Sequence, residues 1–203
     1  QGVQLNHFPD LVKSRSQYLP LLELSVEEDP EDDRNMHYLG REYMYKGRWD
    51  DCIRTLETHL SMKTAVWEDE RAASMRYIAK AYKMKGENKI ARDWYLKAIV
   101  QAPHLREPYM DLAQVLYEEK AWDGVLYFTN CALEIASRPK TYICEAASWG
   151  SLPHDLRAMA FFHTGRLKEA LEEEKRALAI EPQNPRFQGN IEILEKRIKE
   201  SEK

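Results

Sequence analysis

The sequence has few cysteines and few glycines, and both shortages exclude classes of protein. Its three cysteines, Cys52, Cys131 and Cys144, are odd in number and far apart, which fits neither a disulfide framework nor the paired spacing of a zinc site. With 8 Gly and 9 Pro in 203 residues, the chain is neither collagen-like nor of low complexity. We therefore expect a protein of a reducing compartment, with a cytoplasmic location.

Long apolar runs and a strong charge of one sign are also missing. No run approaches the roughly 18 apolar residues of a membrane span, and the start, QGVQLNHFPD, lacks the basic and apolar parts of a signal peptide. The net charge is -4, with 32% charged and 43% apolar residues, which gives no general attraction to nucleic acid or membrane. These features predict a helix-rich globular chain without a nucleic-acid partner.

Small residues recur along the chain at an interval of about 34 residues. Ala79 recurs as Ala113 and Ala98 as Ala132, and the series resumes at Ala158 after an insertion of about 11 residues. No stretch alternates polar and apolar residues as a strand would. The period, the small residues and the prolines that close the repeats resemble the tetratricopeptide repeat. The resemblance implies an all-α superhelix of about four helical hairpins, with an unpaired helix before them and a cap helix after them.

The irregularities of the repeat set the expected boundaries. The turn glycine, Gly86 in the second repeat, is replaced by Lys120 in the third, and Glu174 occupies a normally aromatic position in the fourth. We expect a linker or upstream tail over residues 1–13 and a helical repeat domain over 14–203. The repeats are predicted over about 33–66, 72–105, 106–139 and 151–184, with the cap helix over 185–203.

Signatures of catalysis are not found. The acidic run EEDPEDD, over residues 27–33, is interpreted as capping a helix start. The six histidines form no metal-binding pair on a helix, and there is no glycine-rich phosphate loop or serine nucleophile elbow. We therefore predict no catalytic residues, no metal ligands and no cofactor in this chain.

Binding in a groove is the better prospect. The first helices of stacked hairpins line a concave surface, and their side chains face a ligand rather than the core. The predicted partner-binding residues are Arg34, His37, Arg41, Tyr45, Arg76, Lys80, Lys83, Met110, Gln114 and Tyr117, with Glu107 and Asp111 at neighbouring positions. Such a groove would be basic and aromatic in its N-terminal half and acidic to mixed beyond, which suits an acidic or phosphorylated partner. The alternative is a solvated helix face.

One known binding mode does not fit these positions. Tetratricopeptide co-chaperones hold the C-terminal carboxylate of a chaperone with lysines and asparagines. The matching positions here are His37, Arg41, Tyr77, Glu107 and Asp111. Two acidic side chains would repel a carboxylate, so we exclude this mode.

Some stretches resemble a more specific family. KSRSQYLPLLELSVEEDPEDDRN, ERAASMRYIAKAY, APHLREPYMDLA and RPKTYICEAASWGSLPHDL are similar to the tetratricopeptide region that follows the catalytic domain in bacterial and phage family-2 glycosyltransferases. The insertion carries a WGxxPHDL element, formed by Trp149, Gly150, Pro153, His154 and Asp155. It is open to two interpretations. Either Trp149 packs the loop against the third hairpin and Asp155 caps the fourth, or the element contacts a partner domain.

The resemblance implies chemistry that is carried out elsewhere. Those enzymes have an N-terminal domain of the GT-A type, whose DxD motif holds a divalent metal and a nucleotide sugar, and this sequence contains neither. A start without Met fits a chain that continues an upstream domain. Two hypotheses remain. The chain is the non-catalytic C-terminal region of a glycosyltransferase, where it contacts the catalytic domain, positions the acceptor or forms a homodimer. Alternatively, it is a free-standing adaptor that binds an acidic peptide or protein.

Overall fold

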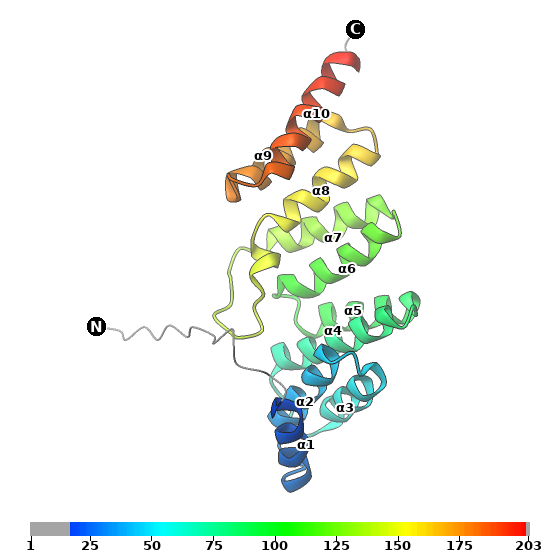
Figure 1. Ribbon diagram of the computed structural model, residues 1–203, viewed down its shortest axis with the longest axis vertical. Helices are drawn as coiled ribbons and strands as arrows, with labels where there is room; N and C mark the ends of the chain where they lie inside the picture. Colours follow the sequence, from blue (N-terminus) through cyan, green and yellow to red (C-terminus); the bar gives the residue numbers. More distant parts are fainter. Residues whose placement is uncertain (1–16, 202–203) are drawn as a thin grey trace, which may run out of the picture.

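The computed structural model describes residues 17–201, in which every regular element is a helix. The expected linker over residues 1–13 lies outside this range. The helices follow one another in a single elongated stack (Figure 1). Four hairpins form, from α2 (Asp33–Tyr45) with α3 (Trp49–Ser61), α4 (Glu68–Met84) with α5 (Asn88–Gln101), α6 (Arg106–Glu118) with α7 (Trp122–Glu134), and α8 (Leu152–His163) with α9 (Leu167–Ile180). The prediction of an all-α hairpin superhelix is confirmed.

Three further elements complete the chain. Helix α1 (Tyr18–Glu28) packs on α2, and α10 (Pro185–Ser201) packs on α9. A short 3-10 helix, η2 (Ala146–Trp149), lies in the connection between α7 and α8. Helix α4 begins at Glu68 rather than near residue 72, because residues of the WEDER segment form its first turn. No helix in the described range is long and apolar enough to cross a membrane.

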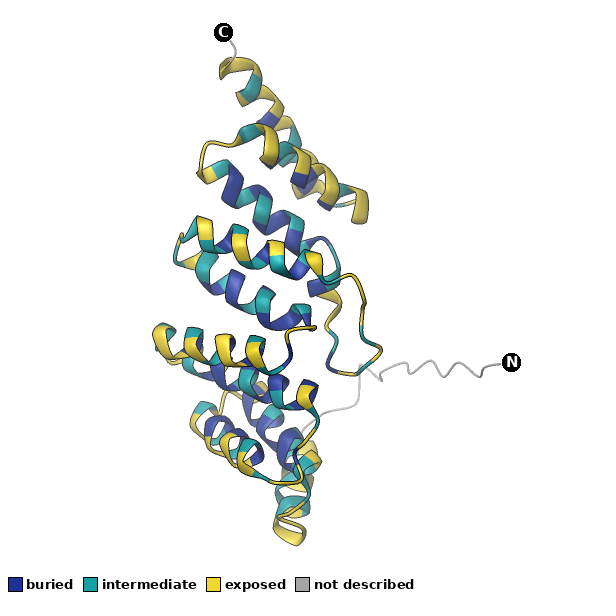
Figure 2. Ribbon diagram, turned by 180° about the vertical axis from the view of Figure 1, so that it is seen from behind, coloured by how far each residue is buried: buried dark blue, intermediate teal, exposed yellow. Residues whose placement is uncertain are grey.

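Small side chains allow the helices of each hairpin to approach. Ala79, Ala91, Ala98, Ala113 and Ala132 are all completely buried, as the repeat predicted. Figure 2 shows the buried residues on the helix faces that meet and the exposed residues on the outside. A methyl group at these crossings permits helix axes about 8–10 Å apart, which larger side chains would prevent.

The turns inside the hairpins require left-handed backbone. Gly47, Gly86 and Gly165 have φ angles of 70°, 81° and 78°, which glycine adopts without a steric penalty. Lys120 takes their place in the third hairpin with a φ of 58°. A non-glycine residue in this conformation is disfavoured by about 1–2 kcal/mol. The third turn is therefore the strained member of the set.

The fourth hairpin meets the cap helix through a polar contact. The buried carboxylate of Glu174 accepts a hydrogen bond of 2.7 Å from the Asn190 side chain of α10. Burial raises the pKa of Glu174, although the bond from Asn190 opposes the shift. At the position where the repeat normally has an aromatic side chain, this protein thus has a carboxylate that is hydrogen-bonded to the cap helix α10. Phe187 and Leu194 supply the buried apolar contacts of α10.

Candidate partner-binding groove

The insertion between α7 and α8 folds back onto the first helices of the hairpins (Figure 1). The Tyr142 hydroxyl donates a hydrogen bond to Glu70 of α4. The Glu145 carboxylate accepts one of 2.9 Å from Arg76 of α4, and its backbone N–H donates one of 2.9 Å to Glu107 of α6. The insertion therefore lies across the N-terminal halves of α4 and α6, on the surface that the sequence assigned to a partner.

Trp149 anchors the end of the insertion against the third hairpin. Its indole N–H donates a 3.1 Å hydrogen bond to Glu107, which is fully buried. The guanidinium of Arg106 lies 4.0 Å from the centre of the indole ring. Gly150 ends η2, and Pro153 is buried in the first turn of α8. The WGxxPHDL element thus makes contacts within the chain.

His154 and Asp155 connect helices of the fourth hairpin and the cap. The His154 ring nitrogen Nδ1 lies 2.7 Å from Glu173 of α9. Asp155 accepts two hydrogen bonds of 2.8 Å each from the guanidinium of Arg186. The expectation that Asp155 caps α8 was wrong, because the N-cap position is Ser151 and the Asp155 carboxylate is turned toward α10.

Three of the predicted groove residues are buried and unable to contact a partner. His37 is completely buried, with Nδ1 2.7 Å from the Ser74 hydroxyl. Met110 is a core residue between the third and fourth hairpins. Arg76 is 3% exposed beneath the insertion. The prediction took these positions as open to a ligand, although one of its interpretations of the insertion packed Trp149 and the loop against the third hairpin.

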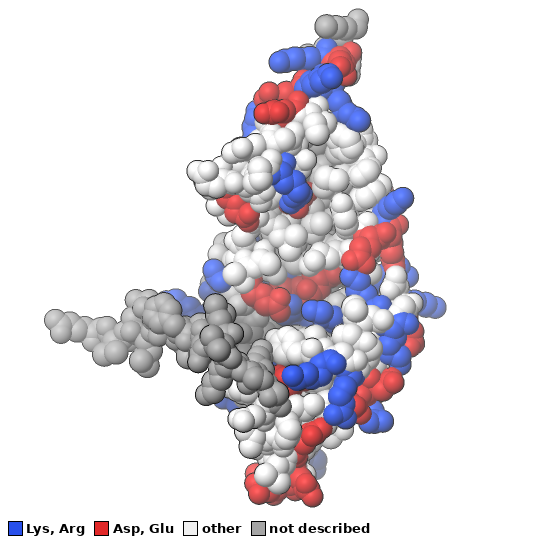
Figure 3. All heavy atoms as spheres, in the orientation of Figure 1, with Lys and Arg blue, Asp and Glu red and all other residues white. Residues whose placement is uncertain are grey.

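The insertion and α6 also remove much of the positive charge expected here. Arg76 lies 2.6 Å from Asp111 and 2.9 Å from Glu145. Burial acts to lower the pKa of Arg76, but the two carboxylates outweigh it and the pKa is raised. Lys83 is paired with Glu118 at 2.6 Å. Basic and acidic residues are interspersed on the face seen in Figure 3. The expectation of a basic N-terminal half is therefore corrected to a largely neutralised one.

Arg34 lies at the edge of this covered region. Its side chain is 60% exposed, and its Nε atom is 3.9 Å from Glu70. The guanidinium is also 5.9 Å from the centre of the Trp67 ring. Arg34 is therefore accessible but shares its charge with a carboxylate of its own chain.

Arg41 differs from the other arginines of the groove. Its guanidinium lies 4.8 Å from the ring centre of Tyr38 and 5.8 Å from that of Tyr142. Its Nε atom is buried and has no hydrogen-bond acceptor in the part of the chain that the structure describes. Tyr77 is nearby, and burial raises the pKa of its phenol to about 12, so it remains neutral. Arg41 is thus a cation among neutral rings with an unused donor.

The concave surface continues toward the C-terminal ends of the first helices. Tyr45 and Lys80 are exposed, at positions one helical turn beyond Arg41 and Tyr77. Gln114 and Tyr117 on α6 are partly buried. We define the open groove as Tyr38, Arg41, Tyr45, Tyr77 and Lys80. It retains Arg41, Tyr45 and Lys80 of the predicted set and leaves out the buried His37, Arg76 and Met110.

Solved structures with the same stacked hairpins support the identity of the fold. The crystal structure of MamA matches with a TM-score of 0.65 at 19% identity, over 81% of this chain and 87% of that one. YrrB, described as a TPR protein with an unusual peptide-binding site, gives 0.65 at 15% identity, over 88% and 84%. PilF of Pseudomonas aeruginosa gives 0.62 at 11% identity, over 83% and 69%. The chain has a tetratricopeptide-repeat (TPR) fold. No protein-family model and no curated protein matches the sequence.

Sequence reasoning missed two aromatic residues that shape the TPR groove. Tyr38 occupies a core-flanking position of α2, and its ring meets that of Tyr142 at 5.8 Å between centroids. Tyr142 belongs to the insertion, which has no counterpart in a regular repeat. The aromatic side chain of Tyr142 was the one sign in the sequence of its role, because a tyrosine in a connecting segment commonly packs on a neighbouring surface.

Proposed function

We propose that this TPR chain is a non-catalytic interaction module that binds an acidic segment of a protein or peptide in the open groove. The observation that carries the proposal is Arg41, a partly exposed cation held against two tyrosine rings. A carboxylate or phosphate would pair with the accessible part of its guanidinium, and charge-assisted hydrogen bonds of this kind are the stronger class. The rings of Tyr38 and Tyr142 would limit the access of water to the pair.

The surroundings of Arg41 restrict how a ligand would lie. The insertion covers the N-terminal halves of α4 and α6, so the ligand would extend from Arg41 toward Tyr45 and Lys80. Both of these side chains are exposed and could contact it. YrrB, which has the same fold at 15% identity, has a peptide-binding site. This supports peptide binding as a function of the fold. The place where a peptide would bind in this chain is inferred from Arg41 alone.

The test is a selection of random displayed peptides on the wild-type chain and on Arg41→Met, which keeps the apolar stem and removes the charge. The wild type should enrich peptides containing Asp or Glu, and the variant should bind the selected peptides at least about tenfold more weakly. Raising the salt concentration should also weaken the binding of the peptides to the wild type. Fluorescence anisotropy with one labelled selected peptide measures both effects.

Arg54→Met is the matched control, because Arg54 is an exposed arginine on α3, a second helix of a hairpin, and is paired with Asp51. It should bind the peptide like the wild type. The proposal is rejected by a selection without acidic enrichment, or by equal binding to the Arg41→Met chain with its melting temperature unchanged.

We also propose that the chain is the C-terminal region of a family-2 glycosyltransferase, in which it contacts the catalytic domain, positions an acceptor or forms a dimer. The support is the similarity of the quoted stretches, above all the WGSLPHDL segment around Trp149. The reading frame upstream of Gln1 decides the matter: a GT-A domain there is the expected result. A frame that opens directly before Gln1 would leave the free-standing adaptor as the better proposal.

A reducing, cytoplasmic location is proposed on the state of the thiols. Cys52, Cys131 and Cys144 are all free, and Cys52 is buried. Burial raises the pKa of the Cys52 thiol to about 12, which keeps it protonated and unreactive. Free thiols with no partner are typical of reducing compartments.

A further inference from the structure

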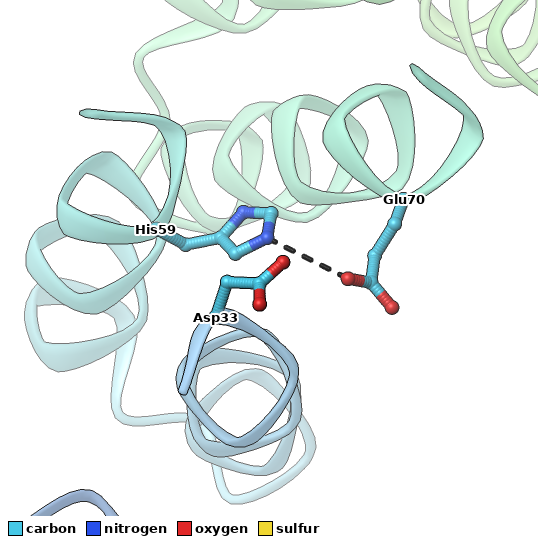
Figure 4. A group of neighbouring side chains, drawn as sticks. All are labelled: Asp33, His59 and Glu70. Atoms are coloured by element: carbon cyan, nitrogen blue, oxygen red, sulfur yellow. Dashed lines mark ion pairs between the residues drawn. The ribbon is translucent and has the colours of Figure 1, made fainter. Parts of the chain in front are cut away.

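Three side chains from three helices converge at one point (Figure 4). Asp33 lies in the first turn of α2, His59 in the last turn of α3 and Glu70 in the first turn of α4. One donor atom from each lies within 4.8 Å of the other two, and His59 Nε2 is 3.7 Å from Glu70 Oε1. The side chains of His59 and Glu70 are 1% and 3% exposed, respectively.

The Nε2 atom of His59 is buried and has no hydrogen-bond partner among the residues that the structure describes. The 3.7 Å separation from Glu70 is too long for a hydrogen bond. A buried polar atom left unpaired is rare in native structures and indicates a missing ion, water or ligand. Here the atom faces two carboxylates rather than an apolar wall.

The other ring nitrogen of His59, Nδ1, already has a hydrogen-bond partner. Its Nδ1 is 3.0 Å from the Ser74 hydroxyl, which is in turn 2.7 Å from Nδ1 of His37. If Nδ1 of His59 donates to Ser74, and Ser74 donates to His37, the lone pair of His59 is on Nε2 and points at the carboxylates. Histidines that ligate metals commonly donate their second N–H in this way, which fixes the tautomer and ring orientation.

Asp33 is free of the capping role that the acidic run was predicted to play. Asp32 is the N-cap residue, and its carboxylate accepts a 2.9 Å hydrogen bond from the Asn35 backbone N–H. The Asp33 carboxylate is turned toward His59 instead (Figure 4). Within the run, Asp32 therefore caps the helix and Asp33 is available to a ligand.

We propose that Asp33, His59 and Glu70 form a binding site for a first-row divalent cation, with Zn²⁺ as the preferred ion and Mn²⁺ as the nearest alternative. Zinc binds imidazole nitrogen and carboxylate oxygen at about 2.0–2.2 Å, so donor atoms around one ion are about 3.4 Å apart. The three donors here need to close by little more than an ångström at most. Two carboxylates also balance the charge of one dication, with the 60% exposed Arg34 at the edge of the site, 3.9 Å from Glu70.

Such an ion would join the first hairpin to the start of the second. It would bridge α2, α3 and α4, and Glu70 would still accept the hydrogen bond from Tyr142 of the insertion. Binding to the folded chain alone raises thermal stability in proportion to the logarithm of ion concentration. The sequence did not reveal this site, because its ligands are dispersed over residues 33 to 70 without a metal-binding motif.

The experiment is isothermal titration calorimetry of the whole chain, freed of metal with a chelator, against ZnCl₂ and MnCl₂ at neutral pH. One Zn²⁺ per chain should bind, with a rise in melting temperature. Asp33→Asn should weaken this binding by at least about tenfold. Asp123→Asn is the matched control, because Asp123 is an exposed aspartate in the first turn of α7, and it should bind as the wild type does.

A second variant and an absorption spectrum test independently whether these three side chains bind the ion. Glu70→Gln should also lose binding, and Co²⁺ in the wild-type site should give a d–d absorption that Asp33→Asn weakens. Asp33 is only partly buried, so its substitution should leave the fold intact even if Glu70→Gln does not fold. The proposal is overturned by a wild type that binds no stoichiometric ion, or by Asp33→Asn binding as tightly as the control, which would place the ion on another histidine.

Discussion

Replacing Arg76 with methionine should lower the free energy of unfolding by about 3 kcal/mol, because it leaves Asp111 and Glu145 without their shared cation. Methionine retains most of the apolar volume of the arginine stem, so the loss should come from charge rather than from a cavity. Asp111 and Glu145 are 21% and 50% exposed and can be partly rehydrated, which places the effect at the low end for a broken buried pair. Urea unfolding followed by circular dichroism measures it.

Lys83→Met is the matched control for Arg76→Met. Lys83 and Glu118 also join α4 to α6, but Lys83 is 26% exposed where Arg76 is 3% exposed, and Glu118 is 55% exposed, so this substitution should change stability by less than about 1 kcal/mol. Adding Asp111→Leu to Arg76→Met should recover stability, because the stranded carboxylate is removed. Equal losses for Arg76→Met and Lys83→Met would show that burial does not strengthen this ion pair.

Gly40→Ala should destabilise the protein by about 2 kcal/mol, although the repeat pattern points the other way. Gly40 occupies the position held by Ala79 and Ala113 in the next repeats, so a consensus substitution would be expected to stabilise the helix. A β-carbon on Gly40, however, would lie 2.3 Å from Leu56 Cδ2 and 2.4 Å from its Cγ. Leu56 is completely buried in the first-hairpin core and has no room to withdraw.

Gly189→Ala separates helix propensity from packing. Gly189 lies within α10, and a β-carbon there would meet nothing within 4 Å. This substitution should raise the free energy of unfolding by about 1 kcal/mol, the ordinary advantage of alanine over glycine inside a helix. Thermal melts of both variants give the comparison. A stabilised Gly40→Ala protein would mean that Leu56 can repack and that the close approach is not a constraint.

The fold was predictable because its contacts are local. The recurrence of Ala79 as Ala113 specifies where helices cross, and Gly86 specifies a turn, since each feature depends on residues within one repeat. The start of α4 was misplaced because the residues before position 72 are good helix formers that an alignment of repeats treats as an insertion. Local patterns indicate which elements form more reliably than where they end.

The groove was only partly predictable, for the opposite reason. Helical spacing predicted that Arg41 and Tyr45 face a ligand, and the structure leaves Arg41 partly and Tyr45 fully exposed. It could not show that Glu145 neutralises Arg76, because the two residues are far apart in the sequence. The insertion has no repeat pattern from which its path could be inferred. The convergence of Asp33, His59 and Glu70 likewise depends on how three helices pack, which residue spacing alone does not give.

The docked insertion also alters how unfolding spreads through the stack. In an ordinary repeat array each unit is coupled only to its neighbours, so local openings begin at either end and travel inward independently. Tyr142 and Glu70 are 72 positions apart, and their contact closes a long loop around the second and third hairpins. Helices α4 to α7 should therefore open as one cooperative unit, with α10 opening at a lower free energy. Native-state hydrogen exchange would show this as one shared protection level across those helices, whereas a gradient from α4 to α7 would show that the loop adds no cooperativity.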